Sequence, residues 1–588
     1  MQPRTLQPST EARQPSYKVP LVVVVVQLCW MVGFPLLNPG STIQYPFFVY
    51  GAVPIAGTLT LLGWFLSRTP RTRSYQVAVL SIFGSLVLSQ AILLDPSVNL
   101  VRVFVFQPII SSVLVVTMFA VRHQTSKVRL GTVVGVLTVV VAFSCTLRMQ
   151  GMTGGLIPQF VWRWRPTTEP PPRLDRRGHD NAREVSLPAG PDDDDWPAFR
   201  GPNRDSVVRR PRLILDWGEF PPKELWRTPI GSGWSSFCVV GDCAFTQEQH
   251  GSDELISCRR VTTGEVLWSH AVAGRFEDSS SGPGPRSTPG YADGRLYALT
   301  ATGILIGLDA FTGSSLWQTD LKQLFGLDVP PWGFASSPLV VQDDVIVFTG
   351  AGEGKSVAAF DRVSGALRWN SGNGGHSYSS AHWVSMQGQP QILVASNQGI
   401  DSLDPASGTR LWQHEWDIGF SPRIVQPCVL PGDALLLATA YGKGTRRLQV
   451  EQKDGRWTTE AIWTSRKLRP YFNDLVYHDG FVYGFNGSIL TCLDASSGEP
   501  SWRKRGFGNG QVLLLQPQSV LLVLSEQGAV SLIEASENDG KVLAQFQALN
   551  GKTWNHPVIS GSHLLVRNGF EAACYKLMLA EPEVTAQP

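Results

Sequence analysis

The stretch Gly307-Leu308-Asp309-Ala310-Phe311-Thr312-Gly313-Ser314-Ser315-Leu316-Trp317 contains the pattern on which the fold prediction rests. A small residue is followed by Asp after two positions, by Gly four positions later and by Trp four positions after that. The same spacing recurs in further copies: Cys258, Arg260, Gly264, Trp268; Ala359, Asp361, Gly365, Trp369; Ser402, Asp404, Gly408, Trp412; and Cys492, Asp494, Gly498, Trp502. Degenerate copies end at Trp463 and near Phe546. A fixed period of this kind indicates a repeat architecture.

Each position of the repeat has a structural reason. Asp at the end of a strand accepts hydrogen bonds from the backbone of the turn that it opens, and Gly supplies the positive φ that such a turn requires. Trp then begins the next strand, where its large ring can pack between neighbouring sheets while the indole N–H finds an acceptor. The repeat therefore predicts β-hairpins whose tryptophans join one sheet to the next.

A second signature marks the first strand of each unit. It is a residue pair before a short apolar run, at Ser236-Phe237, Thr288-Pro289, Ser337-Pro338, Ser380-Ala381, Gln426-Pro427, Asn473-Asp474, Gly510-Gln511 and His556-Pro557. Eight copies, 37 to 52 residues apart, predict an all-β fold, an eight-bladed β-propeller with four-stranded blades. After His556 about three strands remain, so we expect residues 224–230, which include Trp226, to supply the missing strand of the last blade.

The repeat resembles the tryptophan-docking motif of the pyrroloquinoline quinone (PQQ) type of eight-bladed propeller, over about residues 196–577. The segment Trp196-Pro197-Ala198-Phe199-Arg200-Gly201-Pro202-Asn203-Arg204 resembles the opening segment of bacterial PQQ-like repeat proteins. This resemblance implies the quinoprotein-like fold. It leaves the function open, because quinoprotein dehydrogenases and the non-catalytic propeller lipoprotein of outer-membrane assembly machinery share that fold.

The N-terminal part has a different composition from the rest of the chain. Residues 1–148 carry 11 Lys and Arg against two acidic residues, whereas the other 440 residues carry 39 basic and 46 acidic residues. This part contains five uncharged apolar stretches, at 19–37, 47–66, 75–94, 103–121 and 130–147. About 20 apolar residues match the thickness of a bilayer core. We therefore expect an α-helical transmembrane domain of five helices over residues 1–148.

The positions of the basic residues predict the orientation of this domain. They cluster in the N-terminal tail and in the second and fourth loops, and Lys and Arg are retained on the cytoplasmic side of a membrane. Five crossings of the inner (cytoplasmic) membrane from a cytoplasmic N-terminus place all residues after Leu147 in the periplasm. There, residues 149–195, rich in Pro and Asp, should form a linker, residues 196–577 the propeller and residues 578–588 a disordered tail.

Six of the eight cysteines lie in the predicted periplasmic part, where disulfides are permitted. Three of them, Cys258, Cys492 and Cys574, occupy the small-residue position of the repeat and are expected to be packing residues. If Val240 faces Cys243 across a turn, Cys238 lies on the diagonal, outside the range of a disulfide. The chain has no adjacent Cys-Cys pair of the kind that many quinoprotein alcohol dehydrogenases carry.

If the propeller binds a ligand, the site should lie at one mouth of the central channel. Residues just before each first strand should gather there, because every blade repeats the same geometry. The candidates for binding a cofactor are Arg286, Trp332, His376, Tyr378, Arg423, Arg469, Asn473 and Trp554, with Tyr471 and His556 beside them. Such side chains can hold a carboxylated planar molecule, PQQ with Ca²⁺, by pairing and stacking. Alternatively, they fill the channel and bond one another.

Two functions remain open from the sequence. Compact blades without long insertions favour a membrane-anchored, non-catalytic binding or scaffold propeller of the cell envelope, with the lipid bilayer and an envelope protein as partners. Five spans before the propeller resemble the layout of membrane-bound quinoprotein glucose dehydrogenases, which implies a PQQ-dependent dehydrogenase that passes electrons to membrane quinone. No catalytic residue or metal-binding pattern can be assigned, and the acidic propeller offers no basic face for nucleic acid.

Overall fold

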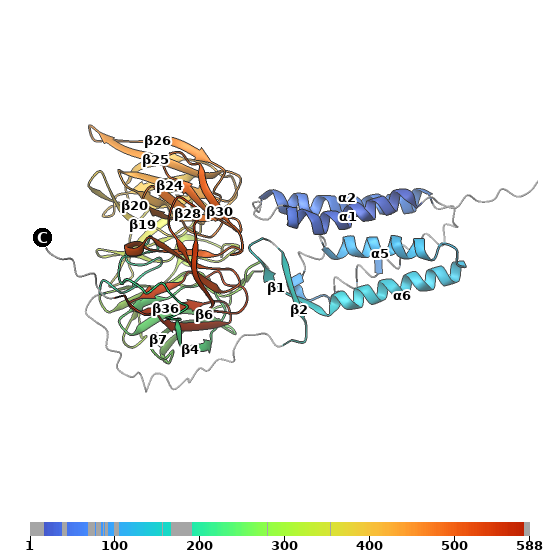
Figure 1. Cartoon of the computed structure of the whole chain (residues 1–588), viewed down its shortest axis with the longest axis horizontal. Helices are drawn as coiled ribbons and strands as arrows, with labels where there is room; N and C mark the ends of the chain where they lie inside the picture. Colours follow the sequence, from blue (N-terminus) through green and yellow to red (C-terminus); the bar gives the residue numbers. More distant parts are fainter. Residues whose placement is uncertain are drawn as a thin grey trace, which may run out of the picture. The chain divides into compact units, whose positions relative to one another are not determined.

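The structure is a computed structural model of the 588-residue chain. It describes residues 17–37, 44–68, 92–98, 105–155, 157–165, 191–278, 280–352 and 354–580, with isolated positions between 77 and 88. The chain divides into two compact units, Met1–Pro166 and Thr167–Pro588 (Figure 1). Each unit has its own hydrophobic core.

The described part of the first unit is mainly helical. Its elements are α1 (Lys18–Leu37), α2 (Gln44–Arg68), the 3₁₀ turn η1 (Pro96–Val98), α5 (Gln107–Ala120) and α6 (Ser126–Cys145). The four α-helices overlap the predicted spans at 19–37, 47–66, 103–121 and 130–147. The predicted span at 75–94 lies for most of its length outside the described residues.

The helices differ in whether they could cross a membrane. Within the described ranges, one helix, Ser126–Cys145, has the length and apolar composition of a membrane span. The apolar helical stretches Lys18–Met31, Ala52–Leu66 and Gln107–Ala120 are shorter. The structure thus supports one of the five predicted crossings, and the five-helix membrane domain stays a prediction.

These helices bury polar groups and expose apolar ones. The amide of Gln27, 1% exposed, donates hydrogen bonds to the carbonyl of Pro54 at 2.8 Å and to the hydroxyl of Thr58 at 3.3 Å. The Thr58 and Ser111 hydroxyls lie 3.1 Å apart, which links α2 to α5. On the outside, Val22 of α1 and Val139 of α6 are 61% and 68% exposed. Polar contacts between helices with an apolar exterior are typical of helices that pack in lipid.

A hairpin follows α6 where the sequence predicted the end of a helix and a linker. Strands β1 (Leu147–Met152) and β2 (Pro158–Trp162) pair antiparallel, with Leu147 opposite Trp162 and Met149 opposite Phe160. The hairpin forms because Met149 and Met152 bury against Leu94, Val98 and Phe106 of the same unit. The acidic run Asp192–Asp195 has no regular secondary structure, but its end contacts the propeller, since the Asp195 carboxylate accepts a 2.9 Å bond from the amide of Gly241.

The second unit is an eight-bladed β-propeller, as predicted. From the inner to the outer strand, its first four blades contain β5 (Cys238–Val240), β6 (Cys243–His250), β7 (Asp253–Arg260), β8 (Val266–Ala273); β11 (Gly290–Ala292), β12 (Arg295–Leu299), β13 (Ile304–Asp309), β14 (Ser315–Asp320); β15 (Leu339–Val341), β16 (Asp344–Phe348), β17 (Val357–Asp361), β18 (Leu367–Ser371); β19 (His382–Met386), β20 (Gln389–Ser396), β21 (Gly399–Leu403), β22 (Arg410–Glu415). A two-stranded ribbon, β9 (Glu277–Asp278) with β10 (Gly282–Pro283), and the short helix α7 (Leu321–Phe325) lie in the connections.

The last four blades complete the ring. They contain β23 (Cys428–Leu430), β24 (Ala434–Thr439), β25 (Gly444–Lys453), β26 (Arg456–Ser465); β27 (Val476–His478), β28 (Phe481–Asn486), β29 (Ile489–Asp494), β30 (Pro500–Lys504); β31 (Gln511–Leu515), β32 (Val520–Leu524), β33 (Ala529–Glu534), β34 (Val542–Gln547); and β35 (Val558–Ser560), β36 (His563–Arg567), β37 (Glu571–Lys576). The seventh blade gains a fifth strand, β3 (Val207–Val208), parallel to β31, and the 3₁₀ turn η3 (Gln516–Gln518) connects β31 to β32.

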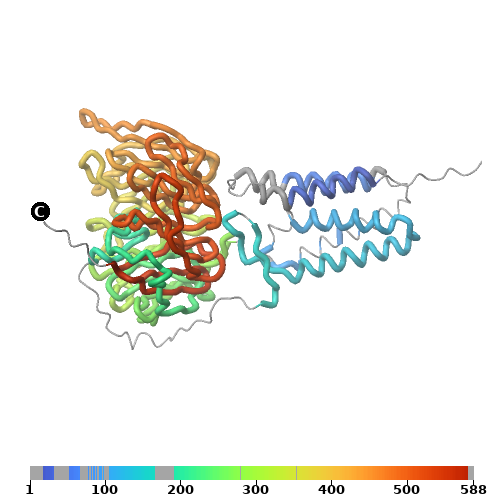
Figure 2. Tube along the Cα trace, viewed as in Figure 1, coloured from blue at the N-terminus to red at the C-terminus, as the bar shows by residue number. Residues whose placement is uncertain are grey.

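The ring closes by the strand that the sequence predicted. β4 (Lys223–Pro229) pairs antiparallel with β37, so Trp226 lies opposite Cys574 and the last blade has four strands. Figure 2 shows the green segment that opens the propeller beside the red C-terminal strands. Residues 578–580, which we expected in a disordered tail, continue this contact, because Leu579 bridges to Leu213. Residues 581–588 lie outside the described part.

Six of the repeat tryptophans dock on the next blade. The indole N–H donates to a backbone carbonyl there at 2.7–3.1 Å: Trp226 to Val261, Trp268 to Ala310, Trp317 to Arg362, Trp369 to Pro405, Trp463 to Ala495 and Trp502 to Ser536. The ring lies on the repeat glycine of that blade; a Cβ on Gly365 would come 2.5 Å from Trp317. Trp412 instead donates to the side-chain oxygen of Gln391 in its own blade at 2.8 Å. In the next blade, β25 and β26 are ten residues long each.

The small residue of the repeat faces the tryptophan of its own blade. Pairs directly across the two strands are Gly307 with Trp317, Ala359 with Trp369, Ser402 with Trp412, Cys258 with Trp268, Cys492 with Trp502 and Cys574 with Trp226. The indole ring occupies the space opposite this position, which explains why the position is Gly, Ala, Ser or Cys in these pairs. All eight cysteines have free thiol groups in the structure. Val240 faces Cys243 across the turn, as expected.

The second signature forms a ring of hydrogen bonds around the channel. In the first blades a backbone N–H donates at 2.9 Å to the hydroxyl of the following blade: Ser236 to Thr288, Thr288 to Ser337 and Ser337 to Ser380. In the other blades each bond involves a side chain. The Gln426 side chain donates to the carbonyl of Ser380, and its backbone N–H donates to the Asp474 carboxylate. The side chains of Asn473, Gln511 and Ser236 donate to the carbonyls of Gly510, Trp554 and His556, respectively. The signature residues therefore hold the eight inner strands together.

The docking of Trp317 on Gly365 can be tested by adding one methyl group. Gly365→Ala places a Cβ against the ring at φ +72°, whereas Gly432→Ala pays the same backbone cost at φ +72° with no atom within 4 Å. We expect Gly365→Ala to lower the unfolding free energy by about 1 to 3 kcal/mol more than Gly432→Ala. Urea unfolding followed by tryptophan fluorescence measures both. Equal losses would show that the ring does not rest on this glycine.

Candidate functional site

An aromatic cluster occupies one mouth of the channel. It consists of side chains that precede inner strands of different blades and meet at ring-centroid distances of 4.8–6.2 Å: Trp234 with Trp554, Trp554 with Phe472, Phe472 with Tyr471, Tyr471 with Trp332 and Trp332 with Tyr378. His376 lies against Tyr378 at 5.6 Å. The structure thus brings the predicted candidates Trp332, Tyr378, Tyr471 and Trp554 together, with Trp234 and Phe472 as members that we did not name from the sequence.

Charged groups at the mouth are engaged with one another or with these rings. Arg286 forms an ion pair with Asp278, and both side chains are about nine-tenths buried. The Lys552 ammonium lies 5.1 Å from the Trp234 ring centroid and 4.3 Å from that of Trp554. Burial lowers the pKa of Lys552 to about 8. These contacts stabilise the aromatic cluster, because a cation over an indole face is attracted by the ring quadrupole.

The other sequence candidates are parts of the scaffold. Arg423 is fully buried and donates to the carbonyls of Ser396, Ala438 and Trp416 at 2.9–3.1 Å. Half-buried Arg469 donates to the side chain of Asn486, and buried Asn473 donates to Gly510. His556 lies beside Asp474, 3.3 Å from its carboxylate.

This arrangement does not fit a bound PQQ with its cation. Arg286 and Arg423, two of the three arginines expected to pair with its carboxylates, already have protein acceptors, and the faces of Trp332 and Trp554 already contact other rings. Among the described residues no group of three His, Cys, Asp or Glu side chains could hold a metal ion. These side chains contact one another and form a cluster that fills the mouth of the channel.

The opening segment fills the other end of the channel. Pro197 accepts a bond from the amide of Tyr291 within an inner strand, whereas the mouth residues precede the inner strands. Arg200, 2% exposed, donates to the carbonyl of Leu475 at 2.7 Å and lies 3.6 Å from the Asp474 carboxylate. Arg204 donates at 3.0 Å to Ser337 and Pro338. From the sequence we recognised this segment only by its resemblance, and we did not predict that it crosses the channel.

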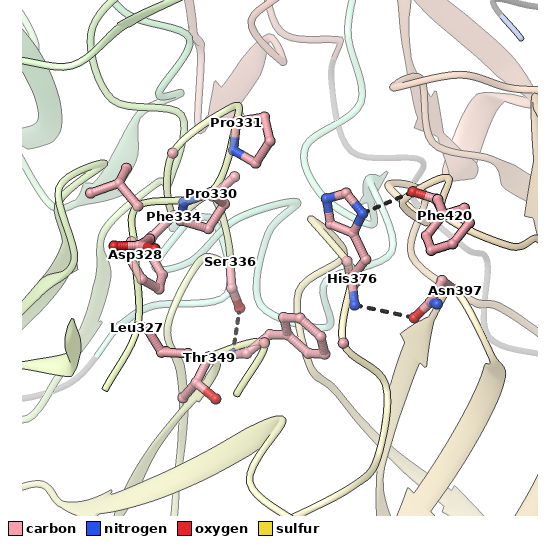
Figure 3. A pocket seen from close by; sticks show the side chains of 17 residues that line it. Leu327, Asp328, Pro330, Pro331, Phe334, Ser336, Thr349, His376, Asn397 and Phe420 are labelled. Atoms are coloured by element: carbon pink, nitrogen blue, oxygen red, sulfur yellow. Dashed lines mark hydrogen bonds between the residues drawn. The ribbon is translucent and has the colours of Figure 1, made fainter. Parts of the chain in front are cut away.

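A groove of about 470 Å³ lies at the rim beside the aromatic cluster. It is formed by the connections around blades 3 and 4, with Leu327, Pro330 and Phe334 on one side and His376, Asn397 and Phe420 on the other (Figure 3). The amide of His376 donates to Asn397 at 3.1 Å, and a His376 ring nitrogen lies 3.0 Å from the carbonyl of Phe420.

No residue in the described part of the chain covers Phe420. Its side chain is 100% exposed, although a phenyl ring gains more from burial than most side chains. We did not identify Phe420 from the sequence, yet a signal was present, because a large apolar residue stands alone in the turn Gly419-Phe420-Ser421-Pro422. An apolar ring at the edge of a groove is suited to contact a partner.

Much of the propeller is similar in sequence to known proteins. A family model described as "Outer membrane protein assembly factor BamB" matches residues 252–504. The chain is 25% identical to BamB of Yersinia pestis over 46% of this chain and 70% of that protein, and 25% identical to BamB of Burkholderia pseudomallei over 59% and 87%. The propeller is thus similar to proteins with PQQ-like repeats.

Solved structures with a similar arrangement have lower sequence identity. BamB from Moraxella catarrhalis matches 60% of this chain and 99% of its own, with 15% identity and a TM-score of 0.43. A europium-containing methanol dehydrogenase matches 65% of this chain and 91% of its own, with 12% identity and a TM-score of 0.41.

Glu254, a buried carboxyl group between the first two blades, gives the propeller a titration that can be measured. It is 1% exposed and accepts bonds from the amides of Ala301 at 2.9 Å and Thr302 at 3.2 Å. Burial raises the pKa of Glu254 to about 7, above its ordinary value of 4.5. A raised pKa means that the folded state binds the proton more tightly than the unfolded state. The stability from this proton is therefore complete below pH 4.5 and is lost as the pH rises through 7.

We expect Glu254→Gln to remove this pH dependence. Relative to the variant, the wild type should lose roughly 2 to 3 kcal/mol of unfolding free energy between pH 5 and pH 8. Thermal unfolding of both proteins at the two pH values measures the difference. Exposed Glu499→Gln is the control and should follow the wild type. A constant offset between wild type and Glu254→Gln at both pH values would contradict the assignment.

Proposed function

We propose that this protein is a membrane-anchored PQQ-like propeller of the cell envelope that acts as a non-catalytic binding module for another envelope protein. The observation that carries the proposal is the contrast at one end of the ring: the mouth side chains contact one another, while Phe420 at the rim is fully exposed. A filled mouth gives a cofactor little room, and an exposed phenyl ring beside a groove favours a protein partner.

The rim suits an extended apolar segment of the partner. Pro330, Phe334 and Phe420 line the groove together with the polar Asn397 and Asp328. Apolar anchors surrounded by a few polar groups are typical of peptide-binding grooves. The relatives named as outer membrane protein assembly factors support a partner from the envelope.

The proposed anchor is the N-terminal unit, a multi-pass domain of the inner membrane with a cytoplasmic N-terminus and a periplasmic propeller. Its support is the long apolar helix α6, the exposed valines of α1 and the polar contacts buried between α1, α2 and α5. In water such an exterior would be costly, and in lipid it costs nothing. The alternative, a PQQ-dependent dehydrogenase with membrane quinone as acceptor, stays a prediction from the sequence.

Photocrosslinking at the groove tests the binding function. A photoreactive amino acid at Asp328, an exposed residue of the groove, should form an adduct with an envelope protein in intact cells. Phe420→Asp should lower the yield about tenfold or more, because it removes an aromatic anchor. Val363→Asp, at a residue 58% exposed outside the groove, is the matched control and should leave the yield unchanged. No adduct, or equal loss in both variants, would refute the proposal.

A further inference from the structure

The β1–β2 hairpin begins two residues after α6, the helix with the properties of a membrane span. α6 ends at Cys145 and β1 starts at Leu147. The amide of Arg163, just after β2, donates to the carbonyl of Thr146 at 2.7 Å, which ties the far end of the hairpin to the end of the helix. If α6 crosses a bilayer, the hairpin therefore lies at the level where that bilayer meets water.

The hairpin has one side in the core and one side that is apolar and exposed. Met149 and Met152 are buried within the first unit. Trp162 and Trp164 stack at 5.2 Å with an interplanar angle of 8°, and they are 44% and 68% exposed. Phe143, on the last turn of α6, meets Trp162 edge-on at 5.9 Å and is 55% exposed. Three aromatic rings thus form one continuous exposed surface from the helix to the hairpin.

Basic side chains accompany these rings. The Arg148 guanidinium donates to the carbonyl of Arg165 at 3.4 Å, so both arginines lie at the open end of the hairpin. Arg163 contacts the carboxylate of Asp95 at 3.7 Å. Residues 126–165 contain no acidic residue. The local charge is therefore positive, beside tryptophans that present an apolar body and a polar N–H.

We propose that this hairpin lies in the interfacial layer of the bilayer that α6 crosses, with Trp162, Trp164 and Phe143 at the boundary of headgroups and acyl chains and with Arg148 and Arg165 bound to the phosphates of anionic phospholipids. Tryptophan is enriched at this depth because its ring is amphipathic, and arginine pairs with phosphate oxygens through its planar fork. The inference rests on the proposed membrane anchor and adds a lipid-binding surface to it.

Spin labels at three depths test the position of the hairpin. The full-length protein with exposed Cys29 and partly exposed Cys145 changed to Ser carries a label at Trp164→Cys, Val139→Cys or Val363→Cys, and is reconstituted in vesicles of phosphatidylcholine with phosphatidylglycerol. Accessibility to oxygen and to a water-soluble nickel chelate reports the depth of each label. We expect Val139 in the hydrocarbon, Trp164 at the interface and Val363 in water.

The outcomes separate this inference from the proposed anchor. With Val139 in hydrocarbon, a Trp164 label as open to the nickel chelate as the Val363 label would overturn the hairpin proposal and leave the anchor intact. A Val139 label in water would overturn both.

The arginines give a second test. Arg148→Gln and Arg165→Gln should each lower the ratio of immobilised to mobile Trp164 label about fivefold in vesicles that contain phosphatidylglycerol. In vesicles of phosphatidylcholine alone the variants and the parent should have equal ratios. An equal ratio in both lipid mixtures for all three proteins would refute the binding of anionic lipid.

Discussion

The contact between the tryptophan of one blade and the glycine turn of the next is the interaction on which the rest of the propeller depends. A single blade such as β11–β14 cannot bury its own faces, and Trp317 closes the gap to its neighbour by covering Gly365 and bonding the Arg362 carbonyl. Repeated around a ring, this contact fixes the angle between blades. β4 then supplies the last outer strand from the start of the unit, so that no edge of the ring is left open.

A closed ring of this kind leaves a channel with two ends, and this chain fills both. Arg200 and Arg204 of the opening segment enter one end and satisfy backbone carbonyls of distant blades, while the aromatic cluster with Arg286 and Lys552 occupies the other. Burial of a guanidinium is costly unless its N–H groups are bonded, and burial lowers the pKa of Arg204 to about 9. These groups therefore specify one arrangement of the ring, and under the proposed binding function the surface left for recognition is the rim.

Features built from the repeated motifs could be predicted from the sequence, whereas contacts between distant, non-repeated segments could not. Motifs such as Gly307 to Trp317 are local and periodic, so the number of blades and the role of Trp226 in closing the ring followed from spacing. The partners of Arg423 are carbonyls from other segments, and no pattern near Arg423 indicates them. The groove at Phe420 is likewise built from connections of several blades, and the hairpin after α6 depends on burial of Met149 against residues some 50 positions earlier.

If the filled channel leaves the rim as the surface for recognition, a partner should cover Phe420 in cells, and hydroxyl-radical footprinting of Phe420 tests this most directly. Phe420 is fully exposed in the isolated chain, and Met578, 51% exposed and far from the groove in sequence, is a reference in the same molecule. We predict that Phe420 is oxidised quickly in the purified protein and several-fold more slowly in intact cells, relative to Met578. An unchanged ratio of the two rates between purified protein and cells would contradict the account.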